Sequence, residues 1–207
     1  MRIQSHLISA VPCPLPSVND LEFCQSVYLC IRDPQFADGG LLIPDNYQDV
    51  VMPLIASLLD QVEPEDYIYV TIRKQHIQPQ SCGNREGWHV DGFLSDDRSF
   101  IWFDSLPTQA AYGVFDVEPD HERSLKQFNE QVDHSFINNL PTETLIELGD
   151  TVHRPVFNTG IDVVLRTFIK IVLSKEKFNG VGNAWNYKLP HIKPTKTRGA
   201  VRNHTVL

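Results

Sequence analysis

The chain has 207 residues, of which 42% are hydrophobic and 21% are charged, so it is long and apolar enough to fold around its own core. The formal net charge of −8 argues against nucleic acid as a general partner, because binding a phosphate backbone requires a basic face. No segment approaches the ~18 consecutive apolar residues of a membrane span. Length and composition therefore predict one globular domain, residues 1–207, that does not enter a membrane.

The cysteines indicate a reducing environment. The sequence has four of them, Cys13, Cys24, Cys30 and Cys82, with no C-x-x-C pair and no nearby histidines at zinc-site spacing. The N-terminal stretch MRIQSHLISAVPCPLPS has an apolar run that is too short and too interrupted by proline for a secretory leader. We therefore expect free thiols and a cytoplasmic location.

Residues 1–66 are expected to form an N-terminal extension that contains one helix. Proline and glycine in residues 1–45 predict an early strand followed by irregular structure. Residues 46–62 carry apolar side chains at helical spacing, and Pro53 sets either the start of that helix or a kink in it. The apolar positions are Val51, Leu54, Ile55, Leu58, Leu59 and Val62.

The middle of the chain, residues 67–174, predicts mainly antiparallel β-structure with an inserted helix. The stretch YIYVTIRK alternates strictly, with Ile68, Val70 and Ile72 on one face, which is typical of a strand. These elements favour a sandwich, a jelly roll or a barrel. The predicted elements are strands over 67–74, 99–105, 111–117, 143–148 and 162–174, and a helix over 119–133 that Asp120 caps.

Residues 175–207 are predicted to be a basic tail without regular periodicity. From Lys177 to Leu207 the sequence contains six Lys and Arg residues and no acidic residue. Such a tail can contact a phosphate or an acidic patch, but a solvated arm is the preferred interpretation.

The motif GWHVDGF places His89 and Asp91 two positions apart among aromatic residues. On a strand such a pair points to the same face, with backbone positions ~6.6 Å apart, so both side chains can reach one metal ion. His153, which follows a predicted Gly-Asp turn, is the candidate third ligand. The alternative is that these are ordinary turn residues bonded to backbone groups.

The predicted strand 162–174 contains one arginine, Arg166, in an apolar run. A buried guanidinium needs an anionic partner and acceptors for its donors. A ligand carboxylate can supply both in a bidentate geometry. The alternative is an outward-facing position at the edge of a sheet, because Lys170 lies on the same face of the strand.

The order of these residues resembles that of the iron(II)- and 2-oxoglutarate-dependent dioxygenases. Members of that family hold iron through an H-x-D motif and a distant histidine within a double-stranded β-helix, a cupin-like jelly roll. Over residues 67–174 the resemblance implies Fe(II) ligation by His89, Asp91 and His153. It also implies that Arg166, thirteen residues after His153, binds the far carboxylate of 2-oxoglutarate.

The resemblance further implies a non-haem iron oxygenase. Such an enzyme uses O₂ and couples the oxidative decarboxylation of 2-oxoglutarate to hydroxylation of a substrate, or to a related oxidation such as desaturation or cyclisation. Two imidazoles and one carboxylate on one face of an octahedral ion leave three positions open for cosubstrate and O₂. Members of the family that halogenate lack the carboxylate ligand, so Asp91 makes halogenation the less favoured outcome. The modest length of the chain favours a small-molecule substrate.

Four further polar residues are candidates for contacts with the cosubstrate. Tyr69 shares a strand face with Thr71 and Arg73, and Thr108 follows the strand after the H-x-D motif. Tyr69 and Thr108 are taken as the cosubstrate contacts. For the residues of the first strand, an outward-facing polar stripe is the alternative.

Two other functions stay open at this stage. One is a cupin-like metal protein that does not use 2-oxoglutarate, in which Arg166 has no role. The other is a non-enzymatic β-sandwich for binding or assembly, in which no metal is bound.

Overall fold

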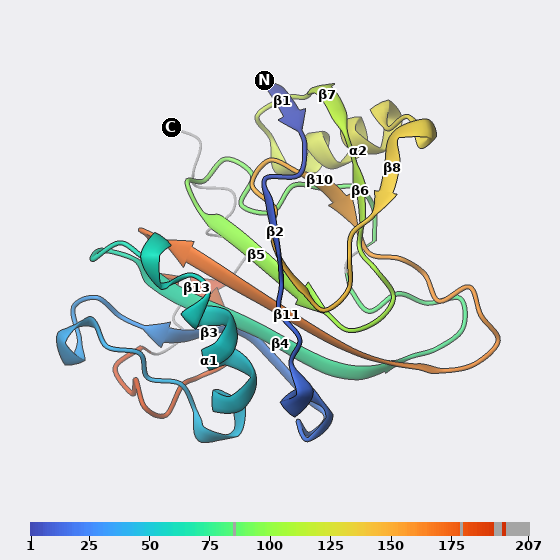
Figure 1. Cartoon of the computed structure of the whole chain (residues 1–207). Coiled ribbons are helices and arrows are strands. Elements are labelled where there is room, and N and C mark those ends of the chain that lie inside the picture. The colour runs from blue at the N-terminus through green and yellow to red at the C-terminus, as the bar shows by residue number, and fades with distance from the viewer. Residues whose placement is uncertain (85, 179, 193–195, 198–207) are drawn as a thin grey trace.

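A computed structural model describes residues 1–84, 86–178, 180–192 and 196–197. In this part of the chain antiparallel strands dominate, and two α-helices accompany the sheets (Figure 1). The principal sheet has six strands in the order β2-β9-β5-β11-β4-β3, and each neighbouring pair is antiparallel. Its strands are β2 (Ser9–Pro12), β3 (Cys24–Arg32), β4 (Tyr67–Ile77), β5 (Arg98–Phe103), β9 (Thr144–Glu147) and β11 (Val164–Ser174).

A second sheet has three strands in the order β10-β6-β8. The segment that contains His89 joins β10 through an antiparallel bridge between His89 and His153. Two further pairs are the antiparallel β1-β7 and the parallel β12-β13. The bounds are β1 (Arg2–Ser5), β6 (Gln109–Ala111), β7 (Gly113–Asp116), β8 (Ile137–Asn139), β10 (Val152–Arg154), β12 (Gly180–Val181) and β13 (Lys196–Thr197).

The chain passes back and forth between the principal and the second sheet. From β4 it enters the His89 segment, returns to β5, crosses to β6 and β8, returns to β9, crosses to β10 and returns in β11. Buried residues of β5, β6 and β9 share one hydrophobic cluster, so the two sheets pack against each other. This alternation is that of a double-stranded β-helix, or jelly roll. The predicted fold class, mainly β with helical additions, is confirmed.

Helix α1 (Gln48–Ala56) covers the outer face of the principal sheet. It buries Val51 and Leu54 against the aliphatic face of β4 and β11, which includes the residues predicted to share one face of β4. The helix ends earlier than predicted, and Pro53 lies in its interior. Short 3₁₀ turns span Pro16–Asn19, Ala37–Gly39, Asp45–Tyr47, Leu59–Gln61 and His134–Phe136.

Helix α2 (His121–Gln131) is the predicted inserted helix. Asp120 caps it as predicted, because its Oδ1 accepts hydrogen bonds from the amides of Glu122 and Arg123 at 3.1 and 2.8 Å. These amides have no partner within the helix. On the buried face of α2, Phe128 packs into a cluster with the aromatic residues beside the H-x-D motif.

Residues 1–45 contain a long strand where irregular structure was expected. β3 pairs with β4, and a β-bulge interrupts its register between Ser26 and Leu29. The strand lies at the edge of the principal sheet. An edge strand with a bulge does not alternate cleanly between apolar and polar residues, which explains why its sequence gives no strand pattern.

Part of the predicted basic tail packs against the principal sheet. Leu189 and Ile192 are buried in a cluster with residues of β3 and β4. The Asn186 amide donates hydrogen bonds to the carbonyls of Cys30 and Leu42. Residues 193–195 and 198–207 of the predicted tail lie outside the described residues.

All four cysteines belong to the described part of the chain, and none of them forms a disulfide. Among the helices that the structure describes, none combines the length and the apolar character that a membrane crossing requires.

Candidate metal centre

Two backbone hydrogen bonds place the predicted histidine ligands side by side. The His89 amide donates to the His153 carbonyl at 3.0 Å, and the His153 amide donates to the His89 carbonyl at 2.9 Å. Their ring centroids are 4.5 Å apart. The motif is flanked by turns at Gly87 and Gly92, whose φ angles of 88° and 69° favour glycine. The second turn directly follows Asp91, so the H-x-D segment is short and fixed at both ends.

The structure brings all three predicted ligands together. The donor atoms of His89, Asp91 and His153 lie within 4.8 Å of one another. His89 Nε2 is 4.0 Å from Asp91 Oδ1, and His153 Nε2 is 3.6 Å from Asp91 Oδ2. A divalent ion ~2.1 Å from each ligand holds two donors at most ~4.2 Å apart. Both His–Asp separations meet that limit, and the 4.8 Å bound for the whole set lies only slightly above it, so the three residues fit one metal ion if they draw slightly closer around it.

Backbone carbonyls orient both imidazole rings. His89 Nδ1 is 2.9 Å from the Gly87 carbonyl, and His153 Nδ1 is 2.9 Å from the Thr151 carbonyl. A carbonyl can only accept a hydrogen bond, so each Nδ1 carries the proton and each Nε2 presents a lone pair. Metal-binding histidines are commonly oriented by such contacts. The donor set is therefore two imidazole nitrogens and one carboxylate.

The charge states of the centre agree with that donor set. Burial, reinforced by the neighbouring His153, lowers the pKa of His89 to about 4, so its ring is neutral near pH 7. Burial alone would oppose ionisation of Asp91, but Lys170 and the two histidines hold the pKa of its carboxyl well below the usual range. The Lys170 ammonium lies 2.8 Å from Asp91 Oδ2. Asp91 is therefore ionised and has a cationic partner.

The centre faces a cavity of about 970 Å³. Its walls combine aromatic rings with many polar and charged groups, so a small molecule bound there could make both apolar contacts and hydrogen bonds. Pockets for drug-sized ligands occupy roughly 300–1,000 Å³, so this cavity lies at the upper end of that range. Its aromatic side chains include Phe93, Phe128, Phe168 and Phe178.

Arg166 lies in the interior, on a central strand of the principal sheet. Its side chain is 3% exposed, which excludes the alternative of an outward-facing position at a sheet edge. Nε donates to the Ser105 carbonyl at 3.0 Å, and the guanidinium lies over the rings of Phe103 and Phe168. Burial lowers the pKa of Arg166 to about 10, so the group is still charged near pH 7. Nη2 has no hydrogen-bond partner within the described residues.

The other two predicted cosubstrate residues lie in different environments. Thr108 is buried and lines the cavity. Tyr69 is buried as well, but its hydroxyl donates to the Glu176 carbonyl at 3.2 Å and accepts from the Phe178 amide at 2.8 Å. The Tyr69 hydroxyl thus fixes the chain after β11, and Tyr69 is not among the residues that line the cavity.

Arg73, which the sequence placed beside Tyr69 and Thr71 as a residue able to contact the cosubstrate, lines the cavity. Arg73 lies opposite Phe168 in the register between β4 and β11. One of its terminal nitrogens donates to the Gly83 carbonyl and to the Asn84 side chain at 3.1 and 3.3 Å. Its Nε is buried without a hydrogen-bond partner in the described part of the chain. Burial lowers the pKa of this guanidinium. The only sequence signal for it was its place on the Tyr69 face of β4.

Tyr28 reaches the cavity because of the bulge in β3. Its φ angle of 50° is unusual for a residue other than glycine and occurs where the register with β4 shifts. The Tyr28 amide donates to Thr71 Oγ1 at 3.1 Å, and its ring centroid is 5.9 Å from Lys170 Nζ. The phenol also packs edge-on against Phe178. No pattern in the sequence predicts this turn of the chain.

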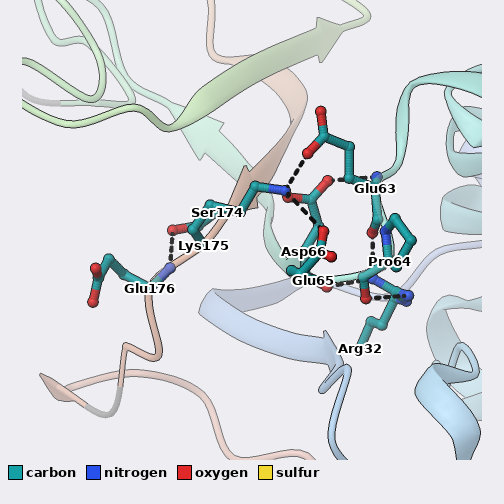
Figure 2. A network of polar contacts seen from close by, with 8 residues as sticks. All are labelled: Arg32, Glu63, Pro64, Glu65, Asp66, Ser174, Lys175 and Glu176. Carbon is teal, nitrogen blue, oxygen red and sulfur yellow. Dashed lines mark hydrogen bonds and ion pairs between the residues drawn. The ribbon is translucent and has the colours of Figure 1, made fainter.

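The rim of the cavity is fixed by a polar network (Figure 2). Lys175, which follows β11 and lines the cavity, forms ion pairs with Glu63 and Asp66. Arg32 donates to the backbone carbonyls of Glu63, Pro64 and Asp66. The network therefore ties the end of β11 to the turn before β4 and neutralises the Lys175 ammonium.

Comparisons with known proteins give no close relative. No family model matches the chain, and no curated protein matches it. Among solved structures, EvdO2 from Micromonospora carbonacea var. aurantiaca aligns with a TM-score of 0.42 and 15% identity over 72% of this chain and 67% of that chain. The same protein complexed with 2-oxoglutarate gives a TM-score of 0.41 at 15% identity, over the same shares of both chains.

A third solved structure is the nickel complex of ThoJ, a non-heme monooxygenase. It aligns with a TM-score of 0.39 and 10% identity over 67% of this chain and 59% of that chain. The jelly-roll assignment depends on the strand order described above, and the metal centre depends on its own geometry.

Proposed function

We propose that the protein is a non-haem iron oxygenase that couples the oxidative decarboxylation of 2-oxoglutarate to hydroxylation, or a related oxidation, of a small molecule. One observation carries the proposal. Two imidazole Nε2 atoms and one carboxylate converge beside a large cavity, with both rings held in the ligating tautomer. Fe(II) bound there would leave three adjacent coordination positions for the cosubstrate and O₂.

The overall reaction balances without a further reductant. One oxygen atom of O₂ enters succinate, the other enters the hydroxylated product, and the lost carboxyl group leaves as CO₂. His89 would contribute a neutral nitrogen donor to this chemistry, His153 would contribute a second imidazole nitrogen, and Asp91 would contribute one negative charge.

Two guanidiniums are suited to bind the far carboxylate of 2-oxoglutarate. Arg166 Nη2 and Arg73 Nε are both buried without hydrogen-bond partners in the described residues. Leaving a buried donor unpaired is costly, so both nitrogens favour an acceptor from a ligand. The charge of Arg73 also acts on Arg166, and a carboxylate that reaches both would offset this repulsion. We assign the primary role to Arg166 and a supporting role to Arg73.

The cavity supports a small-molecule substrate. Its volume of about 970 Å³ exceeds what 2-oxoglutarate needs, and its walls mix aromatic and aliphatic side chains with polar and charged ones. Thr108, Tyr28 and Asn84 supply polar contacts along those walls. A partly apolar molecule with a few hydrogen-bonding groups fits this lining.

A second candidate is a cupin-like metal protein that does not use 2-oxoglutarate. The observation in its favour is that Arg166 is not among the residues that line the cavity. In that case Arg166 is a structural residue between Phe103 and Phe168, and the metal serves another reaction.

The experiment begins with protein purified without oxygen. Elemental analysis measures bound iron, and succinate is then measured with Fe(II) and O₂, in the presence and absence of 2-oxoglutarate. We expect iron in an amount near one per chain and succinate formation that depends on 2-oxoglutarate and on His153. Iron binding without succinate formation would favour the cupin-like alternative, and absence of metal binding would overturn both candidates.

A further inference from the structure

A buried lysine contacts the carboxylate of the candidate metal centre. Lys170 is 8% exposed, lies on β11 and lines the cavity. Its Nζ is 2.8 Å from Asp91 Oδ2, while the same oxygen is 3.6 Å from His153 Nε2. The ring of Tyr28 lies 5.9 Å from the ammonium on another side. The lysine therefore belongs to the immediate surroundings of the three ligands.

The position of this ammonium sets the charge of the centre. With neutral histidines, the negative charge of Asp91 and the positive charge of Lys170 cancel, so the metal-free centre is neutral. A divalent ion ~2.1 Å from the Asp91 carboxylate would lie roughly 7 Å or less from Lys170 Nζ. Solvent screens like charges weakly at that distance inside a protein. The loaded centre then carries two positive charges, and a dianion bound to the ion restores neutrality.

We propose that Lys170 is a built-in counter-ion of Asp91 that weakens the binding of a divalent metal alone and couples tight metal binding to the binding of a dianionic chelator. The inference rests on the metal centre of the proposed function. It assigns a positioning role to Lys170, which acts through Asp91 and not on the substrate. Without this lysine the loaded centre would have one positive charge, and a dianion would leave it negative. Coupling between the two ligands should therefore decrease when the charge is removed.

Two substitutions separate the charge of Lys170 from its hydrogen bond. Lys170→Gln removes the charge and keeps an N–H donor for Asp91. Lys170→Arg keeps the charge in a larger side chain. The matched control is Lys175→Gln, because Lys175 also borders the cavity but is already paired with Glu63 and Asp66 (Figure 2).

The measurement is calorimetric titration of metal-free protein with Co(II), with and without oxalate as a bidentate dianion. For Lys170→Gln we expect Co(II) alone to bind about ten-fold more tightly, because one like charge is gone. We also expect the tightening by oxalate to decrease by about ten-fold. Lys170→Arg and the Lys175→Gln control should follow the wild-type protein. The d–d absorption of bound Co(II) reports whether the three ligands still surround the ion.

Two results would overturn the inference. Unchanged or weaker Co(II) binding by Lys170→Gln would mean that the lysine holds the carboxylate in place, or has no influence, and does not compete with the ion. If that variant does not fold, the wild-type protein still decides, because absence of coupling between oxalate and Co(II) in wild type contradicts the inference directly. Coupling without succinate formation would reject only the oxygenase proposal, and succinate formation without coupling would reject only the role of Lys170.

Discussion

The two faces of β4 and β11 are both buried, but their side chains differ in kind. One face presents Ile72 and Ile169, each fully buried, to the core beneath α1. The other face presents Thr71, Phe168 and Lys170 to the cavity. Alternation along one pair of strands thus separates an apolar core, which stabilises the fold, from a polar and aromatic wall that holds the candidate site.

Two buried lysines, Lys74 and Lys170, lie on opposite faces of this pair of strands and differ in the groups that they contact. Lys74, on the core face, donates to three backbone carbonyls between Val18 and Leu21 at 2.6–3.0 Å. Lys170, on the cavity face, contacts the Asp91 carboxylate instead. Backbone carbonyls keep Lys74 in one fixed structural role, whereas a carboxylate can exchange an ammonium for a metal ion. Substitutions on the cavity face should therefore change function, and substitutions on the core face should change stability.

The largest effect is expected for the metal ligands. His89→Ala, Asp91→Ala and His153→Ala should each abolish succinate formation and lose iron, because two remaining ligands hold a divalent ion poorly. The fold should persist, since the core beneath α1 is untouched, although Asp91→Ala should be less stable because it leaves Lys170 buried without its carboxylate. Elemental analysis, succinate assays and circular dichroism test this. Full iron content and turnover in His153→Ala would show that the assigned ligand set is wrong.

On the core face, Ile169→Ala should lower the free energy of unfolding by about 2–5 kcal/mol, because it leaves a cavity in a fully packed cluster. Ile169→Val is the milder control, with an expected loss of about 0.5–1.5 kcal/mol. Urea unfolding measures both. The Co(II) affinity of the folded protein should stay that of wild type. A large change in the Co(II) affinity at low urea would contradict the claim that core-face substitutions change stability alone.

Arg166→Ala should keep iron and lose affinity for 2-oxoglutarate. A bidentate, charge-assisted pair in a partly dry site contributes about 2–4 kcal/mol, or about thirty- to a thousand-fold in the apparent constant. Arg166→Lys should recover part of this, because an ammonium cannot reproduce the planar fork. Succinate formation against 2-oxoglutarate concentration is the measurement. An unchanged half-saturation value in Arg166→Ala, with a large increase in Arg73→Ala, would transfer the role to Arg73.

Sequence patterns predicted the helices and strands that are determined by residues close together in the chain. The alternation of residues 67–74 gave a strand with its correct core face, and the helical cap at Asp120 was visible from the residue type. The strand β3 was missed because its pairing with β4 across the bulge is a long-range interaction. The packing of Leu189 and Asn186 was missed for the same reason, since nothing near them in the chain indicates their partners.

The candidate site also contains both residues that the sequence predicted and a residue that it did not. The order of His89, Asp91 and His153 in the chain predicted which side chains meet, and the structure brings them together. For Lys170 the residue type was misleading, because a lysine in a strand usually faces solvent and gives no sign of a place in a buried site. Its burial depends on Asp91, which is distant in sequence and becomes its partner through the jelly-roll crossing between the two sheets.

The smallest effect is expected for Thr71, the neutral polar residue of the cavity face. Thr71→Val keeps the shape of the side chain but removes the acceptor for the Tyr28 amide at the bulge. Losing this hydrogen bond should lower the free energy of unfolding by about 1 kcal/mol, and Thr71→Ser should restore it. Urea unfolding of the two variants is the measurement. Co(II) binding should change little, because Tyr28 contacts the lysine and not the metal ligands. A loss as large as that of Ile169→Ala would mean that the wall stabilises the fold as much as the core does, and the contrast between the two faces would not hold.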